Sequence, residues 1–212
     1  QLSCNRTVLD KPVLLCLWWG AKGQVEFYLG VTVAAFDLTT DKELPYGRHG
    51  EIRVLSPARM KGYYKNAKAT AETIDADGWL HSGDIAMKDQ DGFYHITGRI
   101  KDMIIRGGEN IYPREIENFL YKMQGVKMVE VVGIPDAKYG EIVGAFIIPT
   151  DGVELTQEQV QEFCKGQIAR YKIPKYVFFV DDYPKTGSGK VQKFKLREMA
   201  KQRVDAILAQ QA

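Results

Sequence analysis

Apolar residues change their spacing along the chain near residue 98. Before this point they occur in short runs separated by turn residues, at 25–28, 31–36 and 50–55. Short runs with alternating polar positions are typical of antiparallel strands. We expect the first two runs to form a hairpin around Gly30, and we expect a short helix at 67–74, which Asn66 can cap.

Two Asp-Gly dipeptides, Asp77-Gly78 and Asp91-Gly92, separate further apolar segments at 79–86 and 93–97. Asp-Gly favours hairpin turns because both residues tolerate positive φ. We therefore predict that residues 24–98 form a small β-rich subdomain, barrel-like in its partial closure and with a modest core.

After residue 98 helical and strand-like patterns alternate. Pro113 suits a first helical turn, and apolar residues follow it at helical spacing, at Ile116, Phe119, Leu120 and Met123. Thr156 and Gln159 have the spacing of a capping box, and the helix that they begin has an apolar face made of Val160, Phe163, Cys164 and Ile168. A last amphipathic helix carries Leu196, Met199, Ala200, Val204 and Ile207.

Three apolar runs lie between these helices and predict buried strands, at 126–134, 142–148 and 176–180. The order helix, strand, strand, helix, strand, helix describes a compact domain of about 100 residues, which is a usual domain size. We therefore assign the chain to the α+β class, with the β-rich subdomain followed by a second, α+β domain at 99–212.

Composition is that of an ordinary globular protein, with 45% apolar and 26% charged residues and a net charge of +2. This balance gives no case for nucleic acid or for an anionic membrane. Residues 1–23 show no caps or strand partners and stay unassigned, and their apolar run at 12–19 is too short to span a bilayer. The three cysteines, Cys4, Cys16 and Cys164, lack C-x-x-C spacing, which favours a reducing intracellular compartment, the cytoplasm or the mitochondrial matrix.

The junction between the two parts is rich in charges and glycines. It runs through Gly98-Arg99-Ile100-Lys101-Asp102 and continues to the pair Gly107-Gly108 before Pro113. Adjacent glycines permit positive φ or close approach of the backbone to a ligand. An ordinary surface loop before a helix is the alternative interpretation, because loops carry such residues by default.

A second stretch that suggests phosphate chemistry lies at 184–191, with the sequence Pro-Lys-Thr-Gly-Ser-Gly-Lys-Val. It departs from the Walker pattern, which needs glycine where Pro184 stands and Ser or Thr where Val191 stands. What remains is a flexible turn that presents Lys190 between a strand and a helix. Taken alone, this turn is better explained as a solvated loop.

Few other residues have spacings that predict chemistry. Asp84 follows a short polar run and can accept hydrogen bonds from a pair of hydroxyls, although a turn cap is by itself the better explanation. The three histidines, His49, His81 and His95, are not at metal-ligand spacing, so we expect no metal site. The absence of a Gly-x-Ser-x-Gly motif disfavours a serine hydrolase.

Several segments together are far more specific than any one of them. These segments are Gly50-Glu51-Ile52, Lys61–Asn66, Asp77–Asp84, Asp91–Phe93, Gly98–Asp102, Ile104–Pro113, Pro113–Glu117 and Ser188–Lys190. In this order the chain resembles the adenylate-forming acyl-CoA synthetases over about residues 40 to 200, and among them most the medium-chain fatty acid and related acid–CoA ligases. The resemblance implies a ligase that makes an acyl-adenylate from a carboxylic acid and ATP, with Mg²⁺, and then transfers the acyl group to CoA.

The resemblance also implies roles for individual residues. Asp84 would bind the ribose hydroxyls of ATP, and Arg99 would assist at the same nucleotide. Lys101 would occupy the hinge about which a mobile C-terminal domain turns, at a position where many relatives carry aspartate. Gly107 and Gly108 would line the pantetheine tunnel. Lys190 would be the catalytic lysine of the adenylation step.

The chain departs from the family pattern in what it lacks. The Gly/Ser/Thr-rich phosphate loop, the aromatic-Gly-x-Thr-Glu segment and the acid-binding pocket of the family would all precede the matched part. We therefore expect the chain to be a C-terminal third that is catalytically incomplete by itself. The alternatives are a non-catalytic module that binds nucleotide or CoA, and an RNA-binding domain that uses the basic C-terminal helix.

Overall fold

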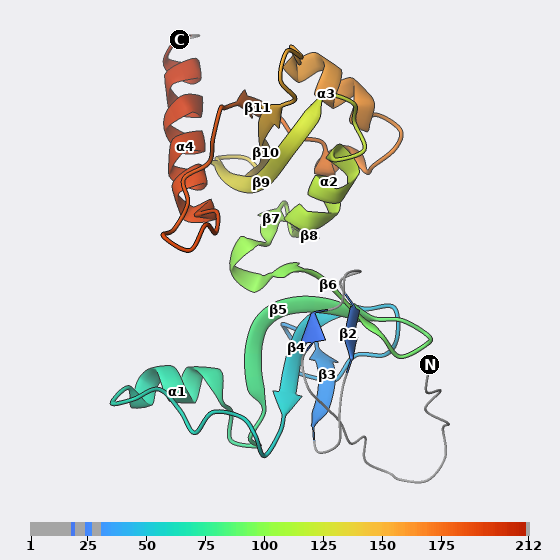
Figure 1. Cartoon of the computed structure of the whole chain (residues 1–212), viewed down its shortest axis with the longest axis vertical. Coiled ribbons are helices and arrows are strands. Elements are labelled where there is room, and N and C mark those ends of the chain that lie inside the picture. The colour runs from blue at the N-terminus through green and yellow to red at the C-terminus, as the bar shows by residue number, and fades with distance from the viewer. Residues whose placement is uncertain (1–17, 20–23, 27–30, 211–212) are drawn as a thin grey trace. The chain divides into compact units, whose positions relative to one another are not determined.

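The computed structural model describes residues 18–19, 24–26 and 31–210. The chain divides into two compact units, of which unit 1 ends at Ile100 and unit 2 begins at Lys101. This boundary lies two residues beyond the point where the apolar spacing changes. Figure 1 shows the elements of each unit, which we describe separately.

Unit 1 is built on an antiparallel sheet with the strand order β1-β2-β6-β5-β4-β3. The strands are β1 Trp18–Trp19, β2 Gln24–Glu26, β3 Thr32–Phe36, β4 His49–Leu55, β5 Leu80–Lys88 and β6 Tyr94–Arg99. The predicted β-rich subdomain is thus confirmed. Its described strands form an open sheet rather than a closed barrel, because β1 and β3 lie at opposite edges of the strand order.

The hairpin predicted for 25–28 and 31–36 is not formed by the described residues. Strand β2 pairs with β1 and β6, with Val25 opposite Tyr94, whereas β3 pairs with β4, with Val33 opposite Val54. Residues 27–30, including the predicted turn glycine, lie outside the described residues. Proximity in sequence favoured the hairpin, but partners far along the chain decided the pairing, as register is set by the faces that strands bury.

The short helix of unit 1 is α1, Ala67–Thr73, and it begins where the sequence predicted. Asn66 caps it, since its side-chain Oδ1 accepts a hydrogen bond of 3.0 Å from the N–H of Ala69. The helix has no buried residue and lies on the surface of the unit.

Unit 2 contains a second sheet with helices on both faces. The 3₁₀ turn η1, Ile100–Asp102, spans the boundary between the units. The other elements of unit 2 are β7 Ile104–Arg106, β8 Glu109–Ile111, α2 Pro113–Leu120, β9 Val126–Asp136, β10 Gly140–Pro149, α3 Gln157–Cys164, η2 Arg170–Lys172, β11 Tyr176–Phe179 and α4 Lys193–Ala209. Strand β10 pairs with β9 in antiparallel and with β11 in parallel, and it meets β7 at Gly140. The predicted order of helices and strands is confirmed, and the small hairpin β7–β8 was missed.

Alternate residues of the central strands pack against different helices. In β10, Val143, Ala145 and Ile147 belong to the core that α2 and α3 cover. Ile142, Phe146 and Ile148 belong to the core that α4 covers (Figure 1). Because both faces are buried, the strand reads as a continuous apolar run instead of an alternating one.

Unit 1 has a much smaller apolar core. Its buried cluster consists of Ala35, Ile52, Ala86 and Tyr94. Next to this cluster, two charged side chains of β4 are also buried, Glu51 at 5% exposed and Arg53 at 6%. Charged residues are almost never this buried unless they are paired. We therefore expect both side chains to have partners of opposite charge.

Candidate functional site

Asp84 and Arg99 lie directly opposite each other on β5 and β6. The Nε of Arg99 donates a hydrogen bond of 2.8 Å to Oδ1 of Asp84. The side chain of Asp84 is 31% exposed and that of Arg99 68%. The two residues for which the family resemblance implies one nucleotide site are therefore adjacent, and their charged groups are accessible.

A bulge in β5 sets the position of Asp84. Between the pairs Glu51–Ile85 and Arg53–His81, β4 advances by two residues (51 to 53) while β5 advances by four (81 to 85). Gly83 has a φ of +71° within this bulge, a conformation that glycine adopts readily. Bulges bend a strand and redirect its side chains, which is why they are frequent beside functional sites.

Two side chains hold the backbone of this bulge. The N–H of Gly83 donates to Oε1 of Glu51 over 3.2 Å, and the N–H of Asp84 donates to Oγ of Ser82 over 3.0 Å. The Ser82 hydroxyl in turn donates to the carbonyl oxygen of Ile52 over 2.6 Å. One oxygen of the buried Glu51 carboxylate thus binds the backbone N–H of the residue that precedes Asp84.

The other oxygen of Glu51 belongs to a network of charges. Oε2 lies 2.9 Å from Nε of Arg53 and 2.9 Å from Nδ1 of His81. The remaining ring nitrogen of His81 lies 3.3 Å from Oδ2 of Asp75. Both ring nitrogens of His81 therefore lie near a carboxylate oxygen, one of Glu51 and one of Asp75.

Arg53 links the network to the surface and to the aromatic core. It pairs with the exposed Asp41, and its guanidinium carbon lies 4.5 Å from the centre of the Phe36 ring. Hydrogen bonding to Arg53 lowers the pKa of Asp41. Burial opposes the charge on Arg53, but its hydrogen bonds to Asp41 and Glu51 raise its pKa above the ordinary value. The arginine therefore stays charged inside the unit.

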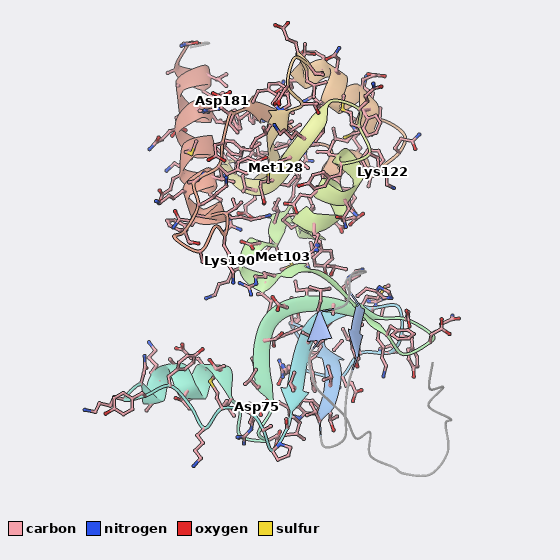
Figure 2. All side chains as sticks on the ribbon, viewed as in Figure 1. Asp75, Met103, Lys122, Met128, Asp181 and Lys190 are labelled. Carbon is pink, nitrogen blue, oxygen red and sulfur yellow. The ribbon has the colours of Figure 1, made fainter. Side chains whose placement is uncertain are left out.

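Lys190 lies in unit 2 on the turn that precedes α4, where Figure 2 labels it. The N–H of Thr186 donates to the carbonyl oxygen of Lys190 over 2.8 Å, and the N–H of Gly189 donates to the carbonyl oxygen of Thr186 over 2.9 Å. The N–H of Lys190 also donates to the Thr186 hydroxyl over 3.1 Å. The turn that we expected to be flexible is thus closed by three hydrogen bonds.

The same turn occurs twice in unit 1. In each of the segments 75–79, 89–93 and 186–190, the N–H of the first residue donates to the carbonyl oxygen of the fifth, and the N–H of the fourth donates to the carbonyl oxygen of the first. The fourth residue is a glycine with positive φ in all three segments. In each case the side chain of the first residue accepts from the N–H of the fifth: the N–H of Trp79 donates to Asp75 over 2.9 Å, and the N–H of Phe93 donates to Asp89 over 2.8 Å. This is a three-residue hairpin loop with a glycine bulge, one residue longer than the Asp-Gly turns that we predicted.

The side chain of Lys190 is exposed, and its ammonium makes no ion pair within residues 31–210. Lys193, three residues later, is different. Its Nζ lies 2.6 Å from Glu117 of α2 and 3.0 Å from Glu130 of β9. Burial raises the pKa of Glu130. Burial also opposes the charge of Lys193, but the two carboxylates raise the pKa of this lysine. One lysine thus anchors the start of α4 and the other projects freely from the turn before it.

Lys101 lies in the 3₁₀ turn η1 and is the first residue of unit 2. Its carbonyl oxygen accepts a hydrogen bond of 2.7 Å from Nη2 of Arg197 on α4. The same guanidinium lies 3.6 Å from Asp102. The backbone that follows the predicted hinge position is therefore attached to the last helix of unit 2.

Gly107 and Gly108 form the two-residue turn between β7 and β8, with φ values of +59° and +89°. Positive φ at both central residues is what this kind of hairpin turn requires, which explains the glycine pair. A Cβ on Gly108 would meet no atom within 4 Å, and one on Gly107 would meet only Tyr139, at 3.7 Å. The surface beside Gly108 is therefore open within unit 2.

Within the described residues no cluster of His, Cys, Asp and Glu has the arrangement of a metal site. His81 and His95 instead each lie beside an aspartate, the latter 2.6 Å from Asp89. No helix of the described part combines the length and the apolar character that crossing a membrane requires.

Sequence reasoning missed the role of Glu51 and Arg53. The signal was present, because β4 carries two charged residues at alternate positions between apolar ones, and both point to the same face of the strand. Their contacts with His81 and Gly83 nevertheless depend on strand pairing across about thirty residues, which spacing alone does not reveal.

Several known proteins are similar to this chain in sequence and in fold. Residues 115–190 match the family model of the AMP-binding enzyme C-terminal domain. The chain is 55% identical over 159 residues to YngI of Bacillus subtilis (strain 168), whose name assigns it to the acyl-CoA synthetases, and this match covers 75% of the chain. It is 44% identical over 178 residues to a feruloyl-CoA synthase of an Amycolatopsis species, covering 84% of the chain. It is 48% identical over 153 residues to the mitochondrial medium-chain acyl-CoA ligase ACSF2 of Rattus norvegicus, covering 72% of the chain.

These matches cover 29%, 35% and 25% of the three relatives, so the chain spans about a third of their length or less. Among solved structures, ATP-bound MatB from Rhodopseudomonas palustris aligns with a TM-score of 0.80 and 42% identity, over 84% of this chain and 36% of MatB. The amide bond synthetase McbA from Marinactinospora thermotolerans aligns with a TM-score of 0.76 and 34% identity, over 81% of this chain and 34% of McbA. The chain therefore belongs to the adenylate-forming enzymes related to acyl-CoA synthetases, and it corresponds to their C-terminal part.

Proposed function

We propose that the chain is the C-terminal part of an ATP-dependent acid–CoA ligase. A carboxylate oxygen of a fatty or related acid attacks the α-phosphorus of ATP, the bond to the β-phosphate oxygen breaks, and pyrophosphate leaves. The thiol sulfur of CoA then attacks the acyl carbon, and AMP leaves as its bond to that carbon breaks. ATP enters as its magnesium complex, in a reducing intracellular compartment such as the cytoplasm or the mitochondrial matrix.

The observation that carries this proposal is the accessible Asp84 carboxylate opposite Arg99, in a chain that matches acyl-CoA synthetases over most of its length. A carboxylate has enough lone pairs to accept from two ribose hydroxyls. Oδ1 of Asp84 accepts from Arg99, while Oδ2 has no hydrogen bond among the described residues. We assign Oδ2 to the ribose, and we assign Arg99 to holding the carboxylate and assisting at the same nucleotide.

Lys190 is the catalytic lysine in this proposal. Adenylation brings a carboxylate against an already anionic α-phosphate, so a cation is needed where negative charge accumulates. A preorganised charge of this kind is typically worth about 3–4 kcal/mol of the barrier. An exposed ammonium without an ion-pair partner in the described part of unit 2 is available for this role, and the hydrogen-bonded turn fixes the backbone from which it projects.

Thioester formation uses other residues of unit 2. We assign Lys101 to a hinge about which unit 2 rotates between the two half-reactions, because hinges absorb rotation in a few backbone dihedrals at element ends. We assign Gly107 and Gly108 to the path of the CoA pantetheine, since the open space beside Gly108 would be filled by a side chain.

The test is pyrophosphate release by the full-length protein with ATP and CoA over a panel of carboxylic acids. We expect acid-dependent release, with AMP and a CoA thioester formed in equal amounts. Binding of ATP or CoA with no acid-dependent pyrophosphate would instead support the non-catalytic binding module.

The RNA-binding alternative has less support. Of the basic residues near the end of the chain, Lys185, Lys193 and Arg197 pair with acidic residues of unit 2, and Arg203 lies over the rings of Phe146 and Phe178. These contacts engage part of the positive charge near the end of the chain, while Lys195 and Lys201 on α4 are exposed. A lack of salt-dependent RNA binding by the chain would exclude this alternative.

A further inference from the structure

We propose that Glu51 and Ser82 are positioning residues that fix the Asp84 carboxylate for recognition of the ribose hydroxyls. We call this pair the bulge clamp. The proposal rests on the proposed function, in which Asp84 binds the ribose, and it adds a specificity role for two residues that do not touch the nucleotide themselves.

The clamp acts on two consecutive backbone amides. Glu51 Oε1 accepts from the N–H of Gly83 over 3.2 Å, and Ser82 Oγ accepts from the N–H of Asp84 over 3.0 Å. The Ser82 hydroxyl is itself oriented by the hydrogen bond that it donates to Ile52 on the neighbouring strand. The backbone on the N-terminal side of Asp84 is therefore held by side chains from β4 and β5, at the place where the strand register shifts.

The clamp needs a carboxylate that does not move. Glu51 is 5% exposed, and its second oxygen is held by Arg53 and His81 at 2.9 Å each. A charge this buried is expensive unless it is fully paired, and such pairs often stabilise a fold less than apolar residues of the same size. A role in orienting the bulge explains why a buried ionic group stands directly behind Asp84.

Orientation matters because hydrogen bonds to hydroxyls weaken steeply with angle. On the other side of the carboxylate, Arg99 binds Oδ1 over 2.8 Å. With the backbone held by the clamp and one oxygen held by Arg99, the remaining oxygen points in one direction. Loss of the clamp would leave the carboxylate present but misdirected, so that binding of the ribose would suffer more than binding of the acid.

The experiment compares ATP with 2′,3′-dideoxy-ATP as substrates of the full-length protein, using kcat/KM for acid-dependent pyrophosphate release. The ratio of the two values measures recognition of the ribose hydroxyls. The variants are Ser82→Ala and Glu51→Gln, with Asp84→Ala as the reference for complete loss. Asp41→Asn is the matched control, because Asp41 contacts the same Arg53 but not the bulge.

We expect each clamp variant to reduce the preference for ATP by about tenfold, the effect of one well-oriented hydrogen bond. The change should lie in KM for ATP, with KM for the acid unchanged and with Asp41→Asn like the wild type. If Glu51→Gln fails to fold, Ser82→Ala carries the test, since it removes a single oxygen atom.

An unchanged ratio in the clamp variants, while Asp84→Ala abolishes the preference, would overturn the proposal and leave the clamp a purely structural feature. If Asp84→Ala also keeps the preference, the ribose assignment in the proposed function is wrong and the clamp proposal falls with it. A protein that shows no acid-dependent pyrophosphate release at all would contradict the proposed function itself.

Discussion

The two units hold their candidate functional residues in opposite ways. In unit 1 the Asp84 carboxylate is fixed by a bulge, by Arg99 and by buried charges in a small apolar core. In unit 2 the Lys190 ammonium projects from an exposed turn, beside a sheet with an apolar core on each face. In unit 2 a partly buried charge lies instead at Lys193, which anchors α4.

This difference suits the two proposed tasks. A group that recognises a neutral sugar works best when its direction is fixed in advance, and unit 1 supplies several contacts for that purpose. A charge that must act in only one of two half-reactions needs a rigid carrier but no permanent partner. In unit 2 the rigid carrier is the packed domain with its closed turn, and the lysine head group itself stays unpaired within the described residues.

The largest expected effect tests the dependence of unit 1 on its buried charges. Arg53→Ala leaves the Glu51 carboxylate buried without its main partner, which typically costs about 3–5 kcal/mol. The measurement is thermal unfolding of the chain monitored by tryptophan fluorescence. This signal reports on unit 1, because all three tryptophans, Trp18, Trp19 and Trp79, precede residue 101. The exposed Arg48 is the control, as Arg48→Ala should leave the transition unchanged. Equal stability of the two variants would contradict the role of the network.

A nearly equal effect is expected for Lys190→Ala in the full-length protein. Adenylation should slow by about 100- to 1000-fold, as for other preorganised charges at a transition state. Thioester formation from supplied acyl-adenylate should stay near the wild-type rate. The control is Lys195→Ala, on the exposed surface of α4. Equal loss of both half-reactions would refute the assignment.

Lys101→Pro tests the hinge. Proline fixes φ near −65°, so it should favour one orientation of unit 2 and slow one half-reaction by about 10- to 100-fold while sparing the other. Lys101→Ala serves as the control for loss of the side chain. Rates of both half-reactions are measured together with the melting temperature. An unchanged melting temperature with both rates intact would exclude the hinge assignment.

Gly108→Leu should act on the second half-reaction alone. A branched side chain beside the thiol path should slow CoA transfer by about tenfold, because it displaces the sulfur from attacking distance. Leucine at a φ of +89° also strains the backbone, by about 1–3 kcal/mol. Gly152→Leu is the matched control, with a φ of +79° and open space around its Cβ. Similar loss of CoA transfer in both variants would show that Gly108 is only a turn residue.

The smallest effect concerns the surface turns of unit 1. The hydrogen bond from His95 lowers the pKa of Asp89 below its ordinary value of 3.8. As the pH falls, Asp89 therefore becomes protonated in the unfolded state before it does so in the folded state. Its contribution to stability is present above pH 3.8 and is lost as the pH falls through the folded-state pKa. We expect Asp89→Asn to lower the melting temperature slightly at neutral pH and to match the wild type in acid. A difference that persists in acid would attribute the effect to packing, and Asp77→Asn at the other turn is the control.

Local sequence patterns determined most of the secondary structure. The N-cap at Asn66, the capping box at Thr156 and Gln159, and Pro113 at the first turn of α2 all act within a few residues, and all are present in the structure. The apolar strands of unit 2 were evident for a similar reason, because a strand covered on both faces has few polar positions. The sequence segments that carry the family resemblance are also short and local.

Tertiary structure alone decided which distant segments pair and which charges meet. The partner of β2 is β6 rather than β3, the unit 1 sheet is open in its described strands, and Glu51 reaches the amide of Gly83. The physical reason is that turn and helix signals arise from local backbone energetics, whereas strand pairing and ion burial depend on contacts between residues far apart in the chain. The sequence by itself therefore identified the candidate residue Asp84, and only the fold revealed what holds it in place.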